Sequence, residues 1–176
     1  MTTDDLTWDE SLLADQPDSL LHWFATECAL RAIERERARG GALASDFERA
    51  VAAKRRFLAG ELTLSKLQKI RKDLKKRMPD ADAATCFDRS AEVQAATHAA
   101  TACVECALED NAGYASSRSW WQLLYAEECA AEIFGTDMTL HESEQARLVD
   151  VVRRLKSVWA EHGASAPKVL EQQAEG

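Results

Sequence analysis

Apolar residues recur at intervals of three and four along most of the chain, and this spacing predicts amphipathic helices. The clearest stripe is followed by Pro79 and consists of Leu64, Leu67, Ile70, Leu74 and Met78. No stretch alternates apolar and polar residues for long, and the 176 residues include only 7 Gly and 3 Pro. We therefore expect an all-α fold.

Caps and glycines divide this pattern into six helices. Capping-box sequences open two of them, at residues 45–48 and 139–142, and glycines follow the ends of several others. We expect helices over residues 19–39, 46–59, 63–78, 91–108, 117–134 and 139–163. Together they predict one domain over 1–163, with a partly ordered arm at 1–17 that packs Trp8 on the body, and a mobile tail at 164–176.

Residues 91–108 stand apart because almost all of them are small. Polar side chains in this segment recur every three or four positions and share one narrow stripe, which Glu109 extends just beyond residue 108. The stripe consists of Gln94, His98, Thr101, Glu105 and Glu109. A helix that is apolar around the rest of its circumference is normally buried on several sides. We expect it in the middle of a compact bundle of about six helices.

Charge is distributed unevenly around a net value of −8. Residues 51–77 carry 10 basic and 2 acidic side chains, whereas residues 78–146 carry 2 basic and 13 acidic ones. The basic side chains concentrate on the polar face of the third helix and include Lys66, Lys69, Lys72, Lys76 and Arg77. They could pair with the protein's own acidic segments or bind a charged partner. Nucleic acid is the less favoured partner, because the rest of the chain is acidic and no aromatic side chain is interleaved among the lysines.

The five cysteines do not form a recognisable metal or redox motif. Cys103 and Cys106 have CxxC spacing, but they lie inside a helix and no second pair supplies further ligands. We expect Cys28, Cys86, Cys103, Cys106 and Cys129 to be reduced, packed thiols, with no metal.

Two readings remain open for the polar stripe. His98, Thr101 and Glu105 could line a polar pocket directed toward Glu127 or Glu128, or they could simply face solvent. The sequence has no Glu-x-x-His pair for a di-iron site, no glycine-rich phosphate loop, no GxSxG and no HExxH. We therefore expect no catalytic residues and no cofactor.

Two segments carry a resemblance to a known family. They read Trp23-Phe-Ala-Thr-Glu-Cys28-Ala and Ala50-Val-Ala-Ala-Lys54-Arg-Arg-Phe57-Leu-Ala-Gly60-Glu61, and alanine-rich helices follow them. Over about residues 20–62 the chain resembles the small helical immunity proteins of bacterial polymorphic toxin systems. The resemblance implies a non-catalytic protein that neutralises a toxin or other effector by binding it, and it supplies no catalytic residues.

The sequence thus predicts a cytoplasmic protein-binding bundle that is not an enzyme. The acidic N-terminus does not look like a signal peptide, and no apolar run is long enough to cross a membrane. The expected partner-binding residues are the five cations of the third helix together with Glu127 and Glu128. One alternative is a small-ligand or metal-binding bundle that uses His98, Glu105, Cys103 and Cys106. A second is a nucleic-acid-associated protein that uses the basic helix 64–78.

Overall fold

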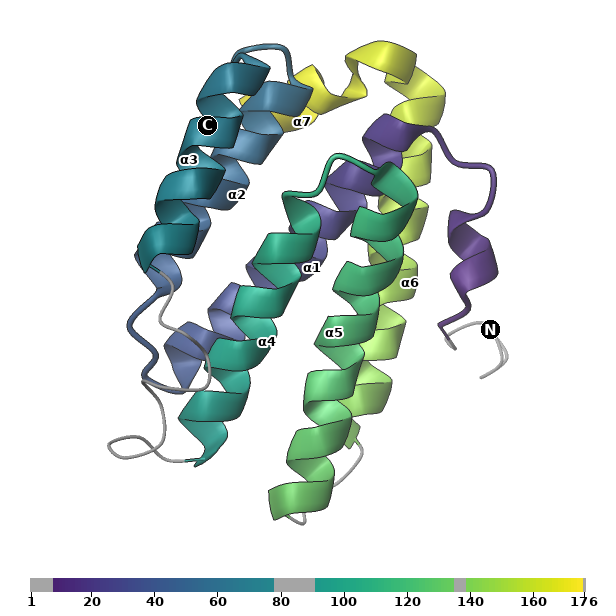
Figure 1. The fold of residues 1–176 in the computed structure, drawn as a ribbon. Helices are drawn as coiled ribbons and strands as arrows, with labels where there is room; N and C mark the ends of the chain where they lie inside the picture. Colours follow the sequence, from purple (N-terminus) through teal and green to yellow (C-terminus); the bar gives the residue numbers. More distant parts are fainter. Residues whose placement is uncertain (1–7, 78–90, 135–138, 176) are drawn as a thin grey trace.

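The computed structural model describes residues 8–77, 91–134 and 139–175, with side chains for residues 8–77, 96–124 and 142–174. The described residues form seven α-helices, two short 3-10 helices and no strand, which confirms the all-α bundle (Figure 1). In chain order they are η2 (Glu10–Leu13), α1 (Asp18–Ala38), α2 (Ala44–Leu58), α3 (Leu64–Arg77), α4 (Ala91–Ala107), α5 (Ala112–Phe134), α6 (Thr139–His162), η3 (Gly163–Ser165) and α7 (Ala166–Glu175).

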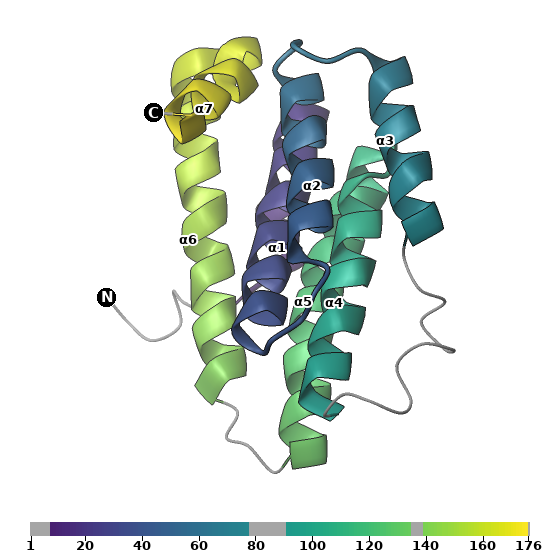
Figure 2. The ribbon, with the colours of Figure 1, turned by 90° about the vertical axis from the view of Figure 1, so that its left-hand side faces the viewer.

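Helix α1 is the most enclosed element of the bundle. It contacts α2, α4, α5, α6 and α7, whereas the small-residue helix α4 contacts α1, α2 and α5. Figure 2 shows α6 and α7 on one side of α1, with α4 and α5 on the other and α3 at the far edge beside α2. The middle of the bundle is therefore α1, and α4 keeps one face open to solvent.

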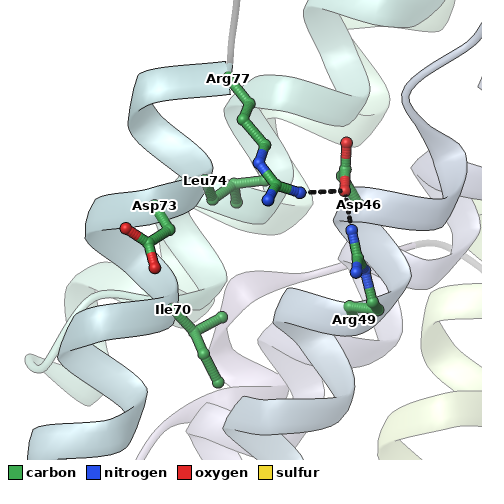
Figure 3. A pocket seen from close by; sticks show the side chains of 6 residues that line it. All are labelled: Asp46, Arg49, Ile70, Asp73, Leu74 and Arg77. Carbon is green, nitrogen blue, oxygen red and sulfur yellow. Dashed lines mark hydrogen bonds and ion pairs between the residues drawn. The ribbon is translucent and has the colours of Figure 1, made fainter.

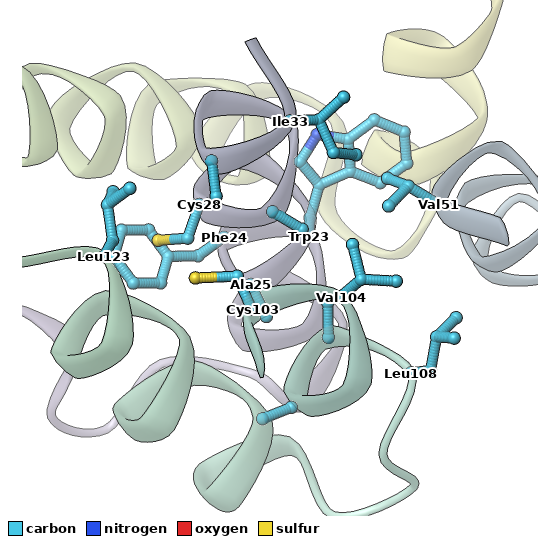
Figure 4. Close-up of a cluster of buried hydrophobic side chains, with 14 of the residues drawn as sticks. Trp23, Phe24, Ala25, Cys28, Ile33, Val51, Cys103, Val104, Leu108 and Leu123 are labelled. Carbon is cyan, nitrogen blue, oxygen red and sulfur yellow. The ribbon is translucent and has the colours of Figure 1, made fainter. Parts of the chain in front are cut away.

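The core forms where large side chains of α1 meet small ones of α4. Trp23 and Phe24 are buried together with Cys103 and Val104 of α4 and Leu123 of α5 (Figure 4). Four buried alanines of α4 (Ala96, Ala99, Ala100 and Ala107) leave room for this close approach. The small residues of α4 thus act as the complement of the bulky residues of α1.

The N-terminal arm is held against this core by an aromatic cluster. The Trp8 ring stacks on Phe24 with centroids 5.5 Å apart and planes at 3°, and it meets Trp120 of α5 at 5.5 Å and 54°. Aromatic pairs at such distances stabilise beyond the area that they bury. The arm from residue 8 onward is therefore fastened to α1 and α5.

Two helices begin differently from the sequence-based expectation. Helix α5 starts at Ala112, several residues before 117, because the Asn111 side chain accepts a hydrogen bond from the Tyr114 N–H at 2.8 Å and caps the helix. The expected capping box of α2 does not form. Its Glu48 pairs with Arg37 of α1 instead, and the helix begins at Ala44 without a side-chain cap.

A buried carboxylate organises the turn between α1 and α2. Glu36 is fully buried, and its Oε1 accepts the Leu43 N–H at 3.2 Å. The carboxylate occupies the space where residue 41 would carry a side chain, since a Cβ on Gly41 would lie 1.9 Å from Glu36 Oε1. Glycine at 41 lets the Glu36 carboxylate lie against the backbone of this turn.

The C-terminal segment differs from the mobile tail that we expected over 164–176. After η3 the chain forms α7, in which Ala166 and Leu170 are buried, and α7 contacts α2 and α6. Pro167 does not prevent this helix, because proline is tolerated in the first turn, where its missing N–H has no helical partner. Leu170 joins the core as a result.

Among the described helices, none has both the length and the apolar character needed to span a lipid bilayer. Helix α1, for example, is long enough but carries charged side chains throughout its second half.

Candidate protein-binding surface

The basic helix α3 packs on α2 through an apolar stripe. Leu67 and Leu74 are buried and Ile70 is half-buried, as their spacing predicts. Leu64 belongs to the same stripe by sequence but is 46% exposed at the start of the helix. Met78 lies outside the described residues. The stripe fixes which side of α3 faces α2 and therefore which cations face outward.

The arginines of α3 serve the protein's own structure. Arg71 forms an ion pair with Glu109, the last member of the polar stripe, just beyond the end of α4. Arg77 Nη1 lies 3.1 Å from Asp46 Oδ1 of α2, and Arg49 reaches the same carboxylate oxygen. The intramolecular role that the sequence left open thus belongs to the arginines.

The lysines of α3 face solvent instead. We call Lys66, Lys69, Lys72 and Lys76 the lysine row; all four are exposed. Lys76 Nζ lies 3.8 Å from Asp73 on the same helix, and the other three have no ion pair with another described residue. Lys69, Lys72 and Lys76 are spaced three and four residues apart, so they share one outer face of the helix. The row is a strip of exposed positive charge on an otherwise acidic protein.

A pocket lies beside the lysine row, between α2 and α3 (Figure 3). It has a volume of about 240 Å³ and is lined by Asp46, Arg49, Ile70, Asp73, Leu74 and Arg77. The pKa of Asp46 is lowered mainly by the hydrogen bond and charge of Arg49, and further by the charge of Arg77. The pocket could not be predicted from sequence, because it joins two helices whose facing residues Asp46 and Arg77 lie 31 positions apart in the chain.

The polar stripe of α4 lies on the solvent side of the helix. His98 and Glu105 are exposed, and the Thr101 hydroxyl donates to the Thr97 carbonyl at 2.7 Å within the same helix. Gln94, Glu127 and Glu128 lie outside the described side chains. The described members of the stripe therefore do not converge on a pocket.

The CxxC pair is split between core and surface. Cys103 is fully buried and its thiol donates to the Ser119 carbonyl at 3.5 Å, whereas Cys106 is half-buried. Burial raises the pKa of both thiols, which favours their protonated form. Cys28 is buried too, while Cys86 and Cys129 lie outside the described side chains.

His98 projects from the side of α4 opposite Cys103, so the residues of the ligand-binding alternative do not meet. In the described part of the chain, no three His, Cys, Asp or Glu side chains are grouped so that they could hold a metal ion. The alternative built on His98, Glu105 and the CxxC pair has no common site in this geometry.

A buried pair of basic residues near the end of α4 also escaped the sequence analysis. Lys54 is buried, and its Nζ donates to the Glu109 carbonyl at 3.0 Å, where α4 has run out of helical donors. Burial lowers the pKa of Lys54 to about 8. Burial and the charge of Lys54 lower the pKa of the neighbouring His22 to about 4. This pair holds α1 and α2 to the turn between α4 and α5.

An aromatic strip occupies the outer face of α5. Tyr114 and Trp121 are 48% and 41% exposed, and the Arg118 guanidinium lies between them in sequence, 5.8 Å from the Tyr114 ring. Tyr, Trp and Arg are the residue types that most often dominate binding energy at protein interfaces. The preceding residue, Trp120, is partly buried and packs against the core, so the two adjacent tryptophans lie on different faces of α5.

Comparison of the chain with known proteins found no matching family model, no similar curated protein and no similar solved structure.

Proposed function

We propose that this protein is a non-catalytic, protein-binding helical bundle whose lysine row docks on an acidic surface of its partner. The observation that carries the proposal is the division of cations on α3. Arg71 and Arg77 pair with carboxylates of the bundle, whereas the lysines project away from it. Arg71 and Arg77 thus already have carboxylate partners within the bundle, whereas the row is available to a partner protein.

Electrostatics supports this use of the row. Complementary charged surfaces accelerate encounter and exclude like-charged partners. The row lies on a protein of net charge −8, so most of the remaining surface repels an acidic partner and orients it toward α3. The exposed aromatic strip of α5 supports protein binding independently.

A narrower form of the proposal is an immunity or antitoxin-like role, in which the partner is a bacterial effector. Its support is the resemblance over residues 20–62. The residues that carry this resemblance are largely structural, since Trp23, Cys28 and Lys54 are buried. The resemblance therefore supports a similar fold. The proposed binding surface lies outside residues 20–62, on α3.

The proposal is tested with the purified product of the reading frame next to this gene. We expect Lys69→Glu/Lys72→Glu to weaken binding at least tenfold at low salt, with a smaller loss as salt screens the charges. The matched control is Lys168→Glu on α7, which is also exposed. Equal binding by the wild type and both variants would remove the row from the interface.

The immunity role has a separate test. Co-expression of this protein with a toxic neighbouring product should restore growth, and the double variant should restore it less well. The nucleic-acid alternative is tested by retention on duplex DNA at about 150 mM salt. Tight retention that the double variant abolishes would overturn protein binding by the row.

A further inference from the structure

The pocket between α2 and α3 has an apolar wall and a basic rim, which suit one apolar side chain and one carboxylate of a bound segment. Its apolar part is formed by Ile70 and Leu74 and its rim by Arg49 and Arg77, as Figure 3 shows. At about 240 Å³ it is smaller than the pockets that hold drug-sized ligands or cofactors. A single amino-acid side chain is the more suitable occupant.

The two arginines at the rim have hydrogen-bonding capacity to spare. Both contact the same oxygen, Oδ1 of Asp46, although each guanidinium carries five N–H donors. Their side chains are 69% and 59% exposed, so water already competes for these contacts. An incoming carboxylate can therefore take bidentate bonds without leaving a buried charge unpaired.

The charge around the pocket favours an acidic occupant. The second acidic group on its wall, Asp73, is close to Lys76, and the lysine row runs along the same helix. Asp46 is shared between two cations. A segment that brings carboxylates next to an apolar side chain would satisfy the rim, the row and the apolar wall together.

We propose that this pocket anchors an acidic segment of the partner, with one apolar side chain on Ile70 and Leu74 and an adjacent carboxylate bonded to Arg77 and Arg49. This inference rests on the proposed function, because it assigns the pocket to the partner that the lysine row recognises. It adds a requirement for an apolar residue, which charge attraction alone does not impose.

The chain offers a convenient probe, since Ile70 is one of only three isoleucines, with Ile33 and Ile133. Ile33 is buried in the core and serves as an internal reference. Isoleucine-methyl NMR would follow the full-length protein during titration with three blocked heptapeptides. They contain six glutamates around a leucine, six glutamates around a serine, and six lysines around a leucine.

We expect the glutamate–leucine peptide to shift the Ile70 methyl signal and leave Ile33 in place. The glutamate–serine peptide should bind about tenfold more weakly, because it lacks the apolar side chain. The lysine–leucine peptide should not bind. Arg77→Gln should weaken the first peptide about tenfold, whereas Lys75→Gln, which removes an exposed charge from the same helix, should have less than a threefold effect.

Equal affinity for the leucine and serine peptides, with the Ile70 signal unmoved, would overturn the pocket assignment and leave the lysine row as a purely electrostatic surface. If neither the leucine nor the serine glutamate peptide binds, the pocket assignment is also overturned. The proposed function is still decided separately, by the titration with the neighbouring gene product. A single-stranded oligonucleotide that shifts Ile70 at lower concentration than the glutamate–leucine peptide would reassign the pocket to nucleic acid.

Discussion

Two regions of this protein carry clustered cations and use them in opposite ways. Between α1 and α6, Arg31 Nε lies 2.7 Å and Arg35 Nη2 lies 3.0 Å from Oε1 of the buried Glu144. On α3 the lysine row has exposed side chains and almost no ion pairs among the described residues. Positive charge is therefore paired with a buried carboxylate in one region and left in water in the other.

The residue types explain the difference. A guanidinium is planar, weakly hydrated and rich in donors, so it can bond several groups in a confined space; Arg35 also donates to the Leu123 carbonyl at 3.2 Å. A lysine ammonium is strongly hydrated and is best left in water. Burial tends to raise the pKa of Glu144, but hydrogen bonds from Arg31 and the charge of Arg35 lower it overall. The carboxylate remains ionised between its arginines.

The largest expected effect of breaking this contrast is at Glu144. Replacing it with alanine leaves Arg31 and Arg35 without their shared carboxylate, and loss of one partner of a buried ion pair costs about 3 kcal/mol. Urea unfolding would measure the loss. Asp150→Ala removes an exposed carboxylate from the middle of the same helix and should change the free energy of unfolding by less than about 0.5 kcal/mol. Similar losses of stability in both variants would mean that burial of the Glu144 ion pair does not add to its contribution to stability.

The next effect concerns Lys54, the buried exception among the lysines. Its pKa is about 8 in the folded protein and about 10.4 in the unfolded chain, so between these values the unfolded chain binds more protons. The free energy of unfolding therefore rises with pH over this interval. Relative to Lys54→Met, the wild type should gain about 2 kcal/mol from about pH 8 to about pH 10.5. A constant difference across this range in urea titrations would show that Lys54 titrates normally.

Arg71 should show an intermediate effect. Its ion pair with Glu109 is partly exposed, so Arg71→Ala should lower the free energy of unfolding by about 0.5 to 1 kcal/mol, less at high salt. Lys72→Ala on the next position is the control and should be nearly neutral. Thermal melts of both variants at two salt concentrations would measure the loss of stability. A loss for Lys72→Ala as large as that for Arg71→Ala would contradict the division between paired arginines and exposed lysines.

The smallest effect on stability is expected for Lys69→Glu/Lys72→Glu. Neither lysine has an ion pair with another described residue, so the double variant should unfold within about 0.5 kcal/mol of the wild type. Loss of partner binding without loss of stability would show that the lysine row serves binding and does not support the fold. A clear drop in the melting temperature would instead indicate that the row supports the fold.

Local pattern predicted the elements that depend on local physics. Spacing of three and four predicted the stripe of α3 in which Leu67 and Leu74 are buried. The same spacing placed His98 and Glu105 on one face of α4, and both are exposed in the structure. The C-terminal helix was missed because Gly163 and Pro167 look like a terminator and a breaker, whereas the glycine leads into a 3-10 turn and the proline falls in a first turn.

Long-range pairing could not be predicted in this way. Arg31 and Glu144 are separated by 113 positions, Arg71 and Glu109 by 38, and Arg77 and Asp46 by 31. The choice of carboxylate for each cation depends on how whole helices pack. It cannot be predicted from the order of charges along the chain. The basic helix was recognisable from sequence, but its division into structural arginines and exposed lysines was not.

The turn between α1 and α2 has a consequence for how this chain can change over time. Because Glu36 fills the volume beside Gly41, the two positions are not free to vary independently. A mutation that adds a side chain at 41 displaces the carboxylate from the Leu43 N–H, whereas a shorter residue at 36 removes the three atoms that a Cβ at 41 would meet first. The order of the two substitutions therefore matters, and related chains should show either the glutamate with glycine or a smaller residue at 36 with freedom at 41.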